Sequence, residues 1–414
     1  MFSRNFATSL VLACLCHPAA GGEPTPTSTP AQEAFFRARE HQTEYSGPGR
    51  EEPEPTDIAE VRIGYFGPGD PSHSEGGDLW LAAELAVEEA NRRGGYQGKP
   101  FRLVPGWSEN PWGTGVRQVV RMAYTEKVWA IVGGIDGPST HLAEQVAVKA
   151  RLTLLSPAST DKTVNLTNVP WMFSLAPGDH LQAPVMAAAI RERLGREPFV
   201  LVSAEDHDSH LFAVELGRCF AAREMMPSYH FKCSRTAEDL GELIARIVRS
   251  KPHAVVLIAG PDPSARLVTG LRTSGFTGLV FGGPAMGRQR FRQLAGGAAE
   301  GVLFPLLYRS PTPSTECSKF SKFANFSKAF QERSGRLPDY AAAHTYDAVA
   351  LLVAAIRKSG LNRARIRDAV AALSPWPGVT GPVEWDPSGS NTRAVSLGTI
   401  RDGHVIPFAV KQSP

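Results

Sequence analysis

Apolar runs with the composition of β-strands alternate with amphipathic segments of helical length from Val61 onward. This alternation constrains the fold more than any other feature of the chain. Residues 61–67 read VRIGYFG, an apolar run that ends in a Gly-Pro loop, and residues 78–95 follow with helical periodicity. Strands that alternate with helical patterns of about 10–15 residues are typical of βαβ units and a parallel sheet. The runs are continuously apolar, as expected when helices cover both faces of the sheet.

The same rhythm restarts near Asp179. Strand patterns at residues 199–204 and 254–260 again alternate with helical patterns, and a final β segment carries the hairpin signal Asp402-Gly403. The predicted fold class is therefore α/β, with two doubly wound lobes rather than one large sheet.

The first 60 residues differ from the rest. Residues 1–22 hold an apolar stretch of 11 residues from Phe6 to Cys16, followed by small residues. A bilayer-spanning helix needs about 20 residues, so this pattern predicts a signal peptide and an exported, periplasmic protein. A lipid anchor on Cys14 or Cys16 is the alternative. Residues 23–60 are rich in Pro and Glu and poor in aliphatic residues, which predicts a tether. No later stretch is apolar enough to span a membrane.

The charge and the cysteine content of the chain bear on nucleic-acid binding, zinc sites and disulfides. Lys and Arg number 44 against 41 Asp and Glu, and the basic residues are scattered, so no nucleic-acid-binding surface is predicted. Beyond the signal peptide the cysteines are Cys219, Cys233 and Cys317, without zinc-site spacing. A Cys219–Cys233 disulfide and a pair of free thiols are alternatives that the sequence leaves open.

The sequence lacks the motifs of cofactor binding and covalent catalysis. No GxGxxG follows the first predicted strand, and no GxSxG nucleophile turn occurs. The glycine-rich segment at residues 94–100 departs from the phosphate-binding loop at two required positions. We therefore expect a protein that uses no cofactor and is not an enzyme.

Six segments occur in an order that resembles a known family. They read ELAVEEANRRGGYQGKPFRLV, IVGGIDGPSTHLAEQ, LTLLSPAST, GGAAEGVLFPLLY, AAAHTYDAVALL and GVTGPVEWDPSG. Together they resemble the type I periplasmic binding proteins of the leucine/isoleucine/valine-binding class, the substrate-binding proteins of ABC transporters. The resemblance covers about residues 61–410, nearly the whole mature chain.

The resemblance implies two Rossmann-like lobes joined by a three-strand hinge, with a ligand cleft between them. Lobe 1 would comprise residues 61–177 plus 306–378, and lobe 2 would comprise residues 178–305 plus 379–410. The implied function is capture of a small polar solute (amino-acid-like, an amide or an organic acid) by hinge closure, for the permease subunits of an ABC importer. The same module forms the ligand-binding region of several receptors, so a ligand-sensing module that signals to a partner protein is the alternative.

The ligand site is expected in loops at the carboxyl ends of the strands, where open α/β sheets bind ligands and where helix N-termini attract carboxylates. The resemblance implies that Thr160 and the carbonyl of Ala158 hold the ligand, because they match the family pattern residue for residue. Further candidates are the hydroxyl groups of Ser139, Thr140 and Ser159, which lie in two of these strand-end loops. Helix capping is the alternative role for these Ser and Thr residues.

Three positions depart from the family pattern. Gly137 stands where the amino-acid binders usually have a serine, and Ala285 stands where they commonly supply an acid for the ligand's ammonium group. Asp208 lies where a tyrosine commonly packs on the ligand. These departures argue against plain α-amino-acid specificity. The acids that could replace the missing one are Asp208, Glu205, Asp262 and Glu75, and solvated loop acids are the alternative.

Two further features of the loops concern aromatic and metal-binding side chains. Trp112 lies in a strand-end loop and is expected to wall the cleft, since ligand pockets favour aromatic lining. His207 and His210, with the aspartates between Glu205 and His210, have suitable donors for zinc. Polar residues in a strand-to-helix loop explain this run without a metal. Neither a metal site nor a catalytic residue is therefore predicted.

Overall fold

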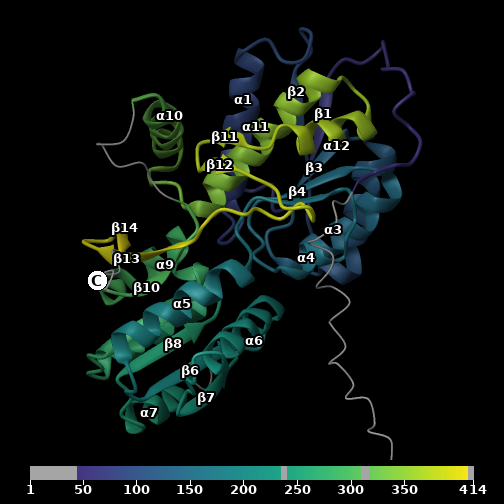
Figure 1. Ribbon diagram of the computed structural model, residues 1–414. Helices are drawn as coiled ribbons and strands as arrows, with labels where there is room; N and C mark the ends of the chain where they lie inside the picture. Colours follow the sequence, from purple (N-terminus) through teal and green to yellow (C-terminus); the bar gives the residue numbers. More distant parts are fainter. Residues whose placement is uncertain (1–43, 235–239, 309–316, 409–414) are drawn as a thin grey trace, which may run out of the picture.

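The computed structural model describes residues 44–234, 240–308 and 317–408, which form two α/β lobes (Figure 1). The predicted signal peptide, its two lipid-anchor cysteines and residues 23–43 of the predicted tether lie outside the described residues. Within the described ranges, no helix is long and apolar enough to cross a membrane.

Lobe 1 is built on a five-stranded parallel sheet with the order β2-β1-β3-β4-β5. Successive side chains of a strand point to opposite faces. Val61 and Ile63 therefore pack with α1, α11 and α12 on one face, and Phe66 packs with α2 and α3 on the other. The elements are β1 (Val61–Phe66), α1 (Gly77–Arg92), β2 (Phe101–Gly106), α2 (Val116–Val120), β3 (Ala130–Gly133), α3 (Gly137–Ala150), β4 (Thr153–Ser156), α4 (Thr163–Leu166), β5 (Met172–Ser174), α11 (Tyr340–Ser359) and α12 (Arg363–Ala372).

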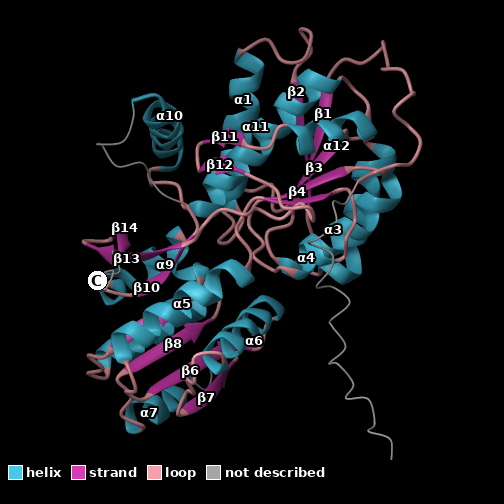
Figure 2. Cartoon of the chain, viewed as in Figure 1, coloured by secondary structure: helices cyan, strands magenta, loops and turns pink. Residues whose placement is uncertain are grey.

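Lobe 2 repeats this arrangement and extends it. Its parallel strands β7-β6-β8-β9-β10 have the same relative order as those of lobe 1, and the antiparallel strands β13 and β14 continue the sheet beyond β10. Helices cover both faces (Figure 2). The elements are α5 (Asp179–Leu194), β6 (Phe199–Ala204), α6 (His207–Ala221), β7 (Tyr229–Cys233), α7 (Leu240–Arg249), β8 (Ala254–Ile258), α8 (Pro261–Thr273), β9 (Leu279–Gly282), η5 (Pro284–Gly287), α9 (Gln289–Ala295), η6 (Gly296–Ala299), β10 (Leu303–Leu306), β13 (Ser396–Arg401) and β14 (His404–Phe408).

The prediction of two doubly wound α/β lobes is therefore confirmed, with some local differences. Between β2 and β3, the short helix α2 is flanked by two π-helical turns, η2 (Pro111–Gly115) and η3 (Arg121–Thr125). The remaining elements are α10 (Cys317–Ser334), which contacts α1, and the short hairpin of β11 (Trp376–Gly378) and β12 (Gly381–Val383). Of the two alternatives for Cys219 and Cys233, the structure has both cysteines free.

The third passage of the chain between the lobes lies later than the sequence indicated. The buried carboxylate of Asp347 on α11 accepts hydrogen bonds from the backbone N–H groups of Val379 (2.7 Å) and Thr380 (2.9 Å). The Asn391 side chain donates to the Leu175 carbonyl of lobe 1. A buried carboxylate needs such donors, which holds this segment on lobe 1. The boundary therefore falls after Asn391 rather than at Val379, and the chain enters the sheet of lobe 2 at β13.

The described end of the predicted tether, residues 44–60, packs against lobe 1. The Asn362 side chain, at the N-terminus of α12, donates to the Gly49 carbonyl oxygen at 2.7 Å. Arg50 forms an ion pair with Asp368 of the same helix at 2.6 Å. These contacts satisfy backbone groups of a segment that has too few apolar residues to fold alone. Residues 44–60 thus belong to the surface of lobe 1, which corrects the prediction for this part of the tether.

We predict that a chain starting at residue 61 is less stable than one starting at residue 44. The shorter chain loses the hydrogen bonds from the Asn362 side chain to the Gly49 and Glu52 carbonyls, and a hydrogen bond typically contributes about 0.5–1.5 kcal/mol to stability. Thermal unfolding of the two truncated proteins would measure the difference, with the full chain as reference. Equal melting temperatures for both truncations would show that residues 44–60 contribute nothing to the stability of lobe 1.

Candidate functional site

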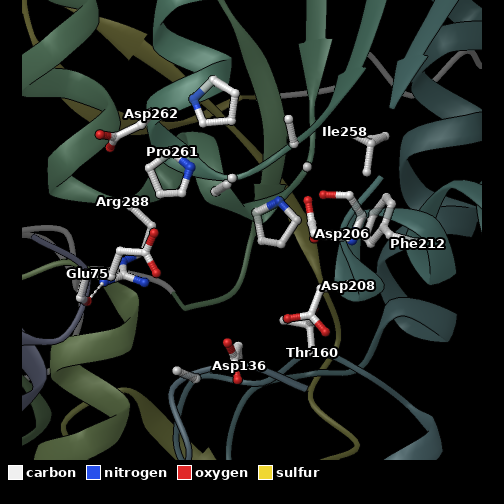
Figure 3. Close-up of a pocket in the computed structure, with 18 of the residues that line it drawn as sticks. Glu75, Asp136, Thr160, Asp206, Asp208, Phe212, Ile258, Pro261, Asp262 and Arg288 are labelled. Atoms are coloured by element: carbon white, nitrogen blue, oxygen red, sulfur yellow. Dashed lines mark hydrogen bonds between the residues drawn. The ribbon is translucent and has the colours of Figure 1, made fainter. Parts of the chain in front are cut away.

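A cavity of about 510 Å³ lies between the carboxyl ends of the two sheets. Lobe 1 contributes the loops that follow β3 and β4, and lobe 2 contributes the loops that follow β6, β8 and β9 (Figure 3). Strand ends of open α/β sheets are where such folds bind ligands. Here two of these edges face one another, so a ligand in the cavity would contact both lobes.

The predicted residues that line this cavity come from both lobes. They are Glu75, Ala158, Thr160, Asp208 and Asp262. Ala285, the position that lacks the family's acid, also lies in the wall. Figure 3 shows Asp136, Asp206 and Arg288 beside them, which the sequence analysis did not single out.

Ser139 and Thr140 do not line the cavity, because their hydroxyl groups are used to build the loop before α3. The Ser139 hydroxyl accepts a hydrogen bond from the Ile135 N–H at 3.1 Å. Asp136 caps the helix and accepts from the Ser139 N–H at 2.8 Å, and the Thr140 hydroxyl donates to the Asp136 carbonyl at 2.7 Å. The capping alternative therefore describes these two residues.

Ser159 and Trp112 also lie outside the cavity wall. Ser159 is buried, and its hydroxyl accepts a hydrogen bond from the Asp161 N–H at 3.3 Å. Trp112 lies in η2 with 58% of its surface exposed, so it does not wall the cleft in this structure. The strand-end position of Trp112 was visible in the sequence, but the direction of its side chain was not.

Asp208 bridges the two lobes. Its carboxylate, in the first turn of α6, accepts a hydrogen bond from the Gly137 N–H at the start of α3, at 3.0 Å. A Cβ at position 137 would lie 2.2 Å from Asp208 Oδ1, so only glycine permits this approach. Two of the three departures from the family pattern, Gly137 and Asp208, therefore form one contact. Burial, reinforced by the nearby Asp136 carboxylate, raises the pKa of Asp208 to about 7.

Arg288 makes the second buried connection between the lobes. Its guanidinium donates to Asp339 Oδ2 at 2.8 Å and to the Glu75 carbonyl at 2.6 Å. Burial alone would lower the pKa of Arg288, but the Asp339 carboxylate outweighs that effect and raises it. Arg288 lies in the cavity wall with its charge already matched, which leaves less of that charge for a ligand.

Acidic groups predominate in the cavity wall, and most of them have partners within the protein. Asp206 caps α6 by accepting from the Ser209 N–H at 3.0 Å. Asp262 is held by both nitrogens of the Arg290 fork at 2.8 Å, which lowers the pKa of Asp262. Two cationic side chains, Arg266 and Arg288, share the wall with the acids. The wall as a whole therefore suits hydrogen-bond donors and cationic groups better than anions.

An acid that the sequence analysis overlooked lies where the chain first crosses from lobe 1 to lobe 2. Asp179 begins α5 and is 2% exposed, and its Oδ1 atom has no hydrogen-bond partner among the described residues. Burial raises the pKa of Asp179 well above its ordinary value. A hydrogen bond from Thr160 opposes this effect, and repulsion from Asp161 and Asp208 adds to it. Burial therefore favours the neutral form of Asp179 in the folded protein.

Two facing strand edges around one cavity define a class of proteins that close two lobes on a small ligand. A family model described as periplasmic binding protein matches residues 60–404, so the chain belongs to the periplasmic binding protein family. An amino acid binding protein from Pseudomonas aeruginosa is 25% identical over 347 residues, which cover 80% of this chain and 87% of that protein.

Solved structures share the fold. The branched-chain amino acid transporter substrate-binding protein LivJ from Streptococcus pneumoniae, in complex with isoleucine, gives a TM-score of 0.75 at 22% identity, covering 84% of this chain and 97% of that one. A Desulfitobacterium hafniense ABC transporter substrate-binding protein in complex with Leu gives 0.70 at 24% identity, covering 84% and 100%. A solute-binding protein from R. palustris in complex with benzoate gives 0.74 at 16% identity, covering 84% and 95%. The predicted membership of the periplasmic binding protein family is thereby confirmed by the family model, and these structures share the fold.

We predict that Gly137→Ala disturbs closure of the lobes while leaving each lobe folded. The added Cβ would clash with the Asp208 carboxylate, and only in the closed form. Small-angle scattering should show a larger radius of gyration for this variant. In an Asp208→Ala background the same substitution should have a smaller effect, because the nearest clashing atom is gone and the contacts with Asp161 Oδ2 (3.0 Å) and His207 (3.1 Å) remain. An equal effect in both backgrounds would contradict the assigned contact.

We also predict that Asp179 makes the fold less stable as the pH rises. Its pKa is raised on folding, so its contribution to stability is complete below the unfolded value of about 3.9 and is lost as the pH rises through the folded value. Asp179→Asn should therefore gain stability relative to the natural protein on the alkaline side, measured by urea unfolding from pH 5 to 9. Asp402→Asn, at an exposed hairpin turn, is the matched control. An unchanged pH slope in Asp179→Asn would refute the assignment.

Proposed function

We propose that the protein is an exported solute-binding protein that captures a small polar solute by closure of its lobes and delivers it to the permease subunits of an ABC importer. One observation carries this conclusion: loops from both lobes wall a single cavity at the facing strand ends. Its volume of about 510 Å³ falls within the range of about 300–1,000 Å³ that is usual for small-molecule sites. The relatives that bind isoleucine, Leu and benzoate support a ligand of this size.

We infer that the solute carries a cationic or hydrogen-bond-donating group toward Glu75. Ala285 offers no acid at the position where the amino-acid binders have one. Of the acids that could replace it, Glu205 does not line the cavity and Asp262 is paired with Arg290. Glu75 lines the cavity, and its carbonyl is fixed by Arg288. Its carboxylate is therefore the best-placed partner for an ammonium or amide group.

The other end of the cavity favours a solute without a free carboxylate. The N–H of Gly137, at the N-terminus of α3, is a natural seat for an anion. In this structure the Asp208 carboxylate occupies that seat. A solute carboxylate would have to displace it against the repulsion of Asp136 and Asp208. We therefore favour an amide or an amine over an organic acid, with Thr160 and the Ala158 carbonyl as its contacts on lobe 1.

The absence of cofactor and nucleophile motifs leads us to propose that the protein binds its solute without converting it. Thermal-shift screening of amines, amides, amino acids and aromatic acids would identify the solute, since a ligand stabilises the folded state by mass action. Mass spectrometry after denaturation should then recover the solute unchanged. A converted product would revive an enzymatic function.

For the identified solute, we predict that Thr160→Ala weakens binding about five- to a hundred-fold. The change removes a hydrogen-bond partner in a closed cavity, a loss of about 1–3 kcal/mol. Glu75→Gln should weaken binding strongly if the solute is cationic and weakly if it is a neutral amide. Trp112→Ala is the control, since Trp112 lies outside the wall. Calorimetric affinities that are equal in all four proteins would show that the solute binds elsewhere.

A further inference from the structure

We propose that His141, Asp161 and His207 form a site for a divalent transition-metal ion, with zinc as the best match, that links the two lobes beside the cavity. Within the described residues these side chains form a group whose donor atoms all lie within 4.8 Å of one another. His141 and Asp161 belong to lobe 1, whereas His207 begins α6 of lobe 2. This site is independent of the identity of the solute.

The donor atoms have a spacing that suits zinc. The Nε2 atoms of His141 and His207 lie 3.1 Å and 2.9 Å from the same oxygen, Asp161 Oδ2. Zinc binds imidazole nitrogen and carboxylate oxygen at about 2.0–2.2 Å in tetrahedral geometry. This geometry separates adjacent ligand atoms by about 3.3 Å. Movements of a few tenths of an ångström at these contacts would bring them to that spacing.

Surrounding groups already orient two of the ligands. Asp161 Oδ1 accepts hydrogen bonds from the Thr163 N–H at 2.8 Å and from its hydroxyl at 2.7 Å, which leaves Oδ2 directed at the histidines. The Nδ1 atom of His141 faces Glu144 Oε2 at 3.5 Å. A carboxylate behind the second ring nitrogen is the usual support of a metal-binding histidine. The Thr163 hydroxyl, 2.9 Å from His141 Nε2, would turn its lone pair toward the ion.

The exposure of the three ligands provides an entry path. The Asp161 side chain is fully buried, and His141 is 19% exposed, whereas His207 is 43% exposed. An ion can therefore reach the site from solvent on the His207 side, and a water molecule can complete the coordination there. Two imidazoles and one carboxylate favour zinc, cobalt, nickel or copper over magnesium and calcium, which prefer oxygen ligands.

A metal at this position would act on closure of the lobes. His207 also lines the solute cavity, so its position depends on how the lobes meet. An ion that binds ligands from both lobes stabilises the closed arrangement. The stabilisation comes from the free energy of its bond to His207, the one ligand from lobe 2. The metal would therefore increase the closed fraction in the absence of solute. The sequence offered His207 and His210 as suitable donors and led to no predicted metal site, whereas the structure groups His207 with His141 and Asp161.

The test uses the full chain, treated with a chelator, and the metal alone. Titration calorimetry with zinc should give one site per chain, and cobalt should give the visible absorption bands of a low-coordinate complex. Zinc should also raise the melting temperature and reduce the radius of gyration in scattering. His207→Gln should weaken zinc binding at least ten-fold and abolish the compaction. Because residue 207 is half-exposed, this substitution should leave the protein folded. His210→Gln, one helical turn further along α6, is the matched control and should bind as the natural protein does.

Three outcomes would overturn the proposal. They are no zinc binding below millimolar concentration in the natural protein, undiminished binding in His207→Gln, and equal losses in His207→Gln and His210→Gln. Asp161→Asn should also abolish binding, with circular dichroism to confirm that it folds. Failure to find a solute in the screen described above would not affect these results, because no solute is present in them.

Discussion

The buried ion pair between Arg288 and Asp339 determines how the two lobes face each other. Arg288 follows η5 in lobe 2, and Asp339 is the N-cap of α11 in lobe 1. The Asp339 carboxylate accepts from Arg288, from the Gln289 N–H at 3.1 Å and from the Ala342 N–H at 3.0 Å. Charges removed from water are tolerated only when such partners are complete. If the loop after β9 moved away from the N-terminus of α11, one charge of the pair would become exposed or would stay buried without a partner.

A second set of cross-lobe contacts lies between α6 and the loops of lobe 1. Asp208 reaches Gly137, His207 reaches Asp161, and Lys162 of lobe 1 pairs with Glu215 of α6 at 2.6 Å. Because these contacts involve one helix, α6 moves as a unit when the lobes separate. Arg288 and α6 lie at different parts of the cleft. Together they hold the two facing strand edges in a fixed relative position around the cavity.

The sequence was sufficient to predict the two lobes, because strands buried on both faces are continuously apolar and alternate with segments of helical length. The apolar run at residues 61–67, for example, was predicted as a strand and is β1 (Val61–Phe66). Loops were harder to interpret. Residues 379–391 and 44–60 have few apolar side chains, and their positions are set by hydrogen bonds to the side chains of Asp347 and Asn362, which have no signal in the sequence.

The candidate site was predictable to the same limited degree. The sequence located the strand-end loops, and the resemblance identified Thr160 and Ala158 in the wall. It did not separate hydroxyl groups that cap a helix, such as Ser139, from those that face a cavity, because both follow a strand and begin a helix. Arg288 was overlooked because the partner of its buried ion pair, Asp339, is far away in the sequence. Asp136 was overlooked although its cap contact with Ser139 is local.

The packing of residues 44–60 on α12 determines to which lobe the N-terminal part of the chain is attached. Whatever precedes residue 44 in the chain is joined to lobe 1, because Gly49 and Arg50 are bonded to Asn362 and Asp368 there. If the N-terminal end of the chain is held at a surface, lobe 1 is the stationary half and lobe 2 is the half that travels. A partner that recognises the closed protein would then detect the position of lobe 2. The part of lobe 2 that moves against lobe 1 is α6, with its polar contacts.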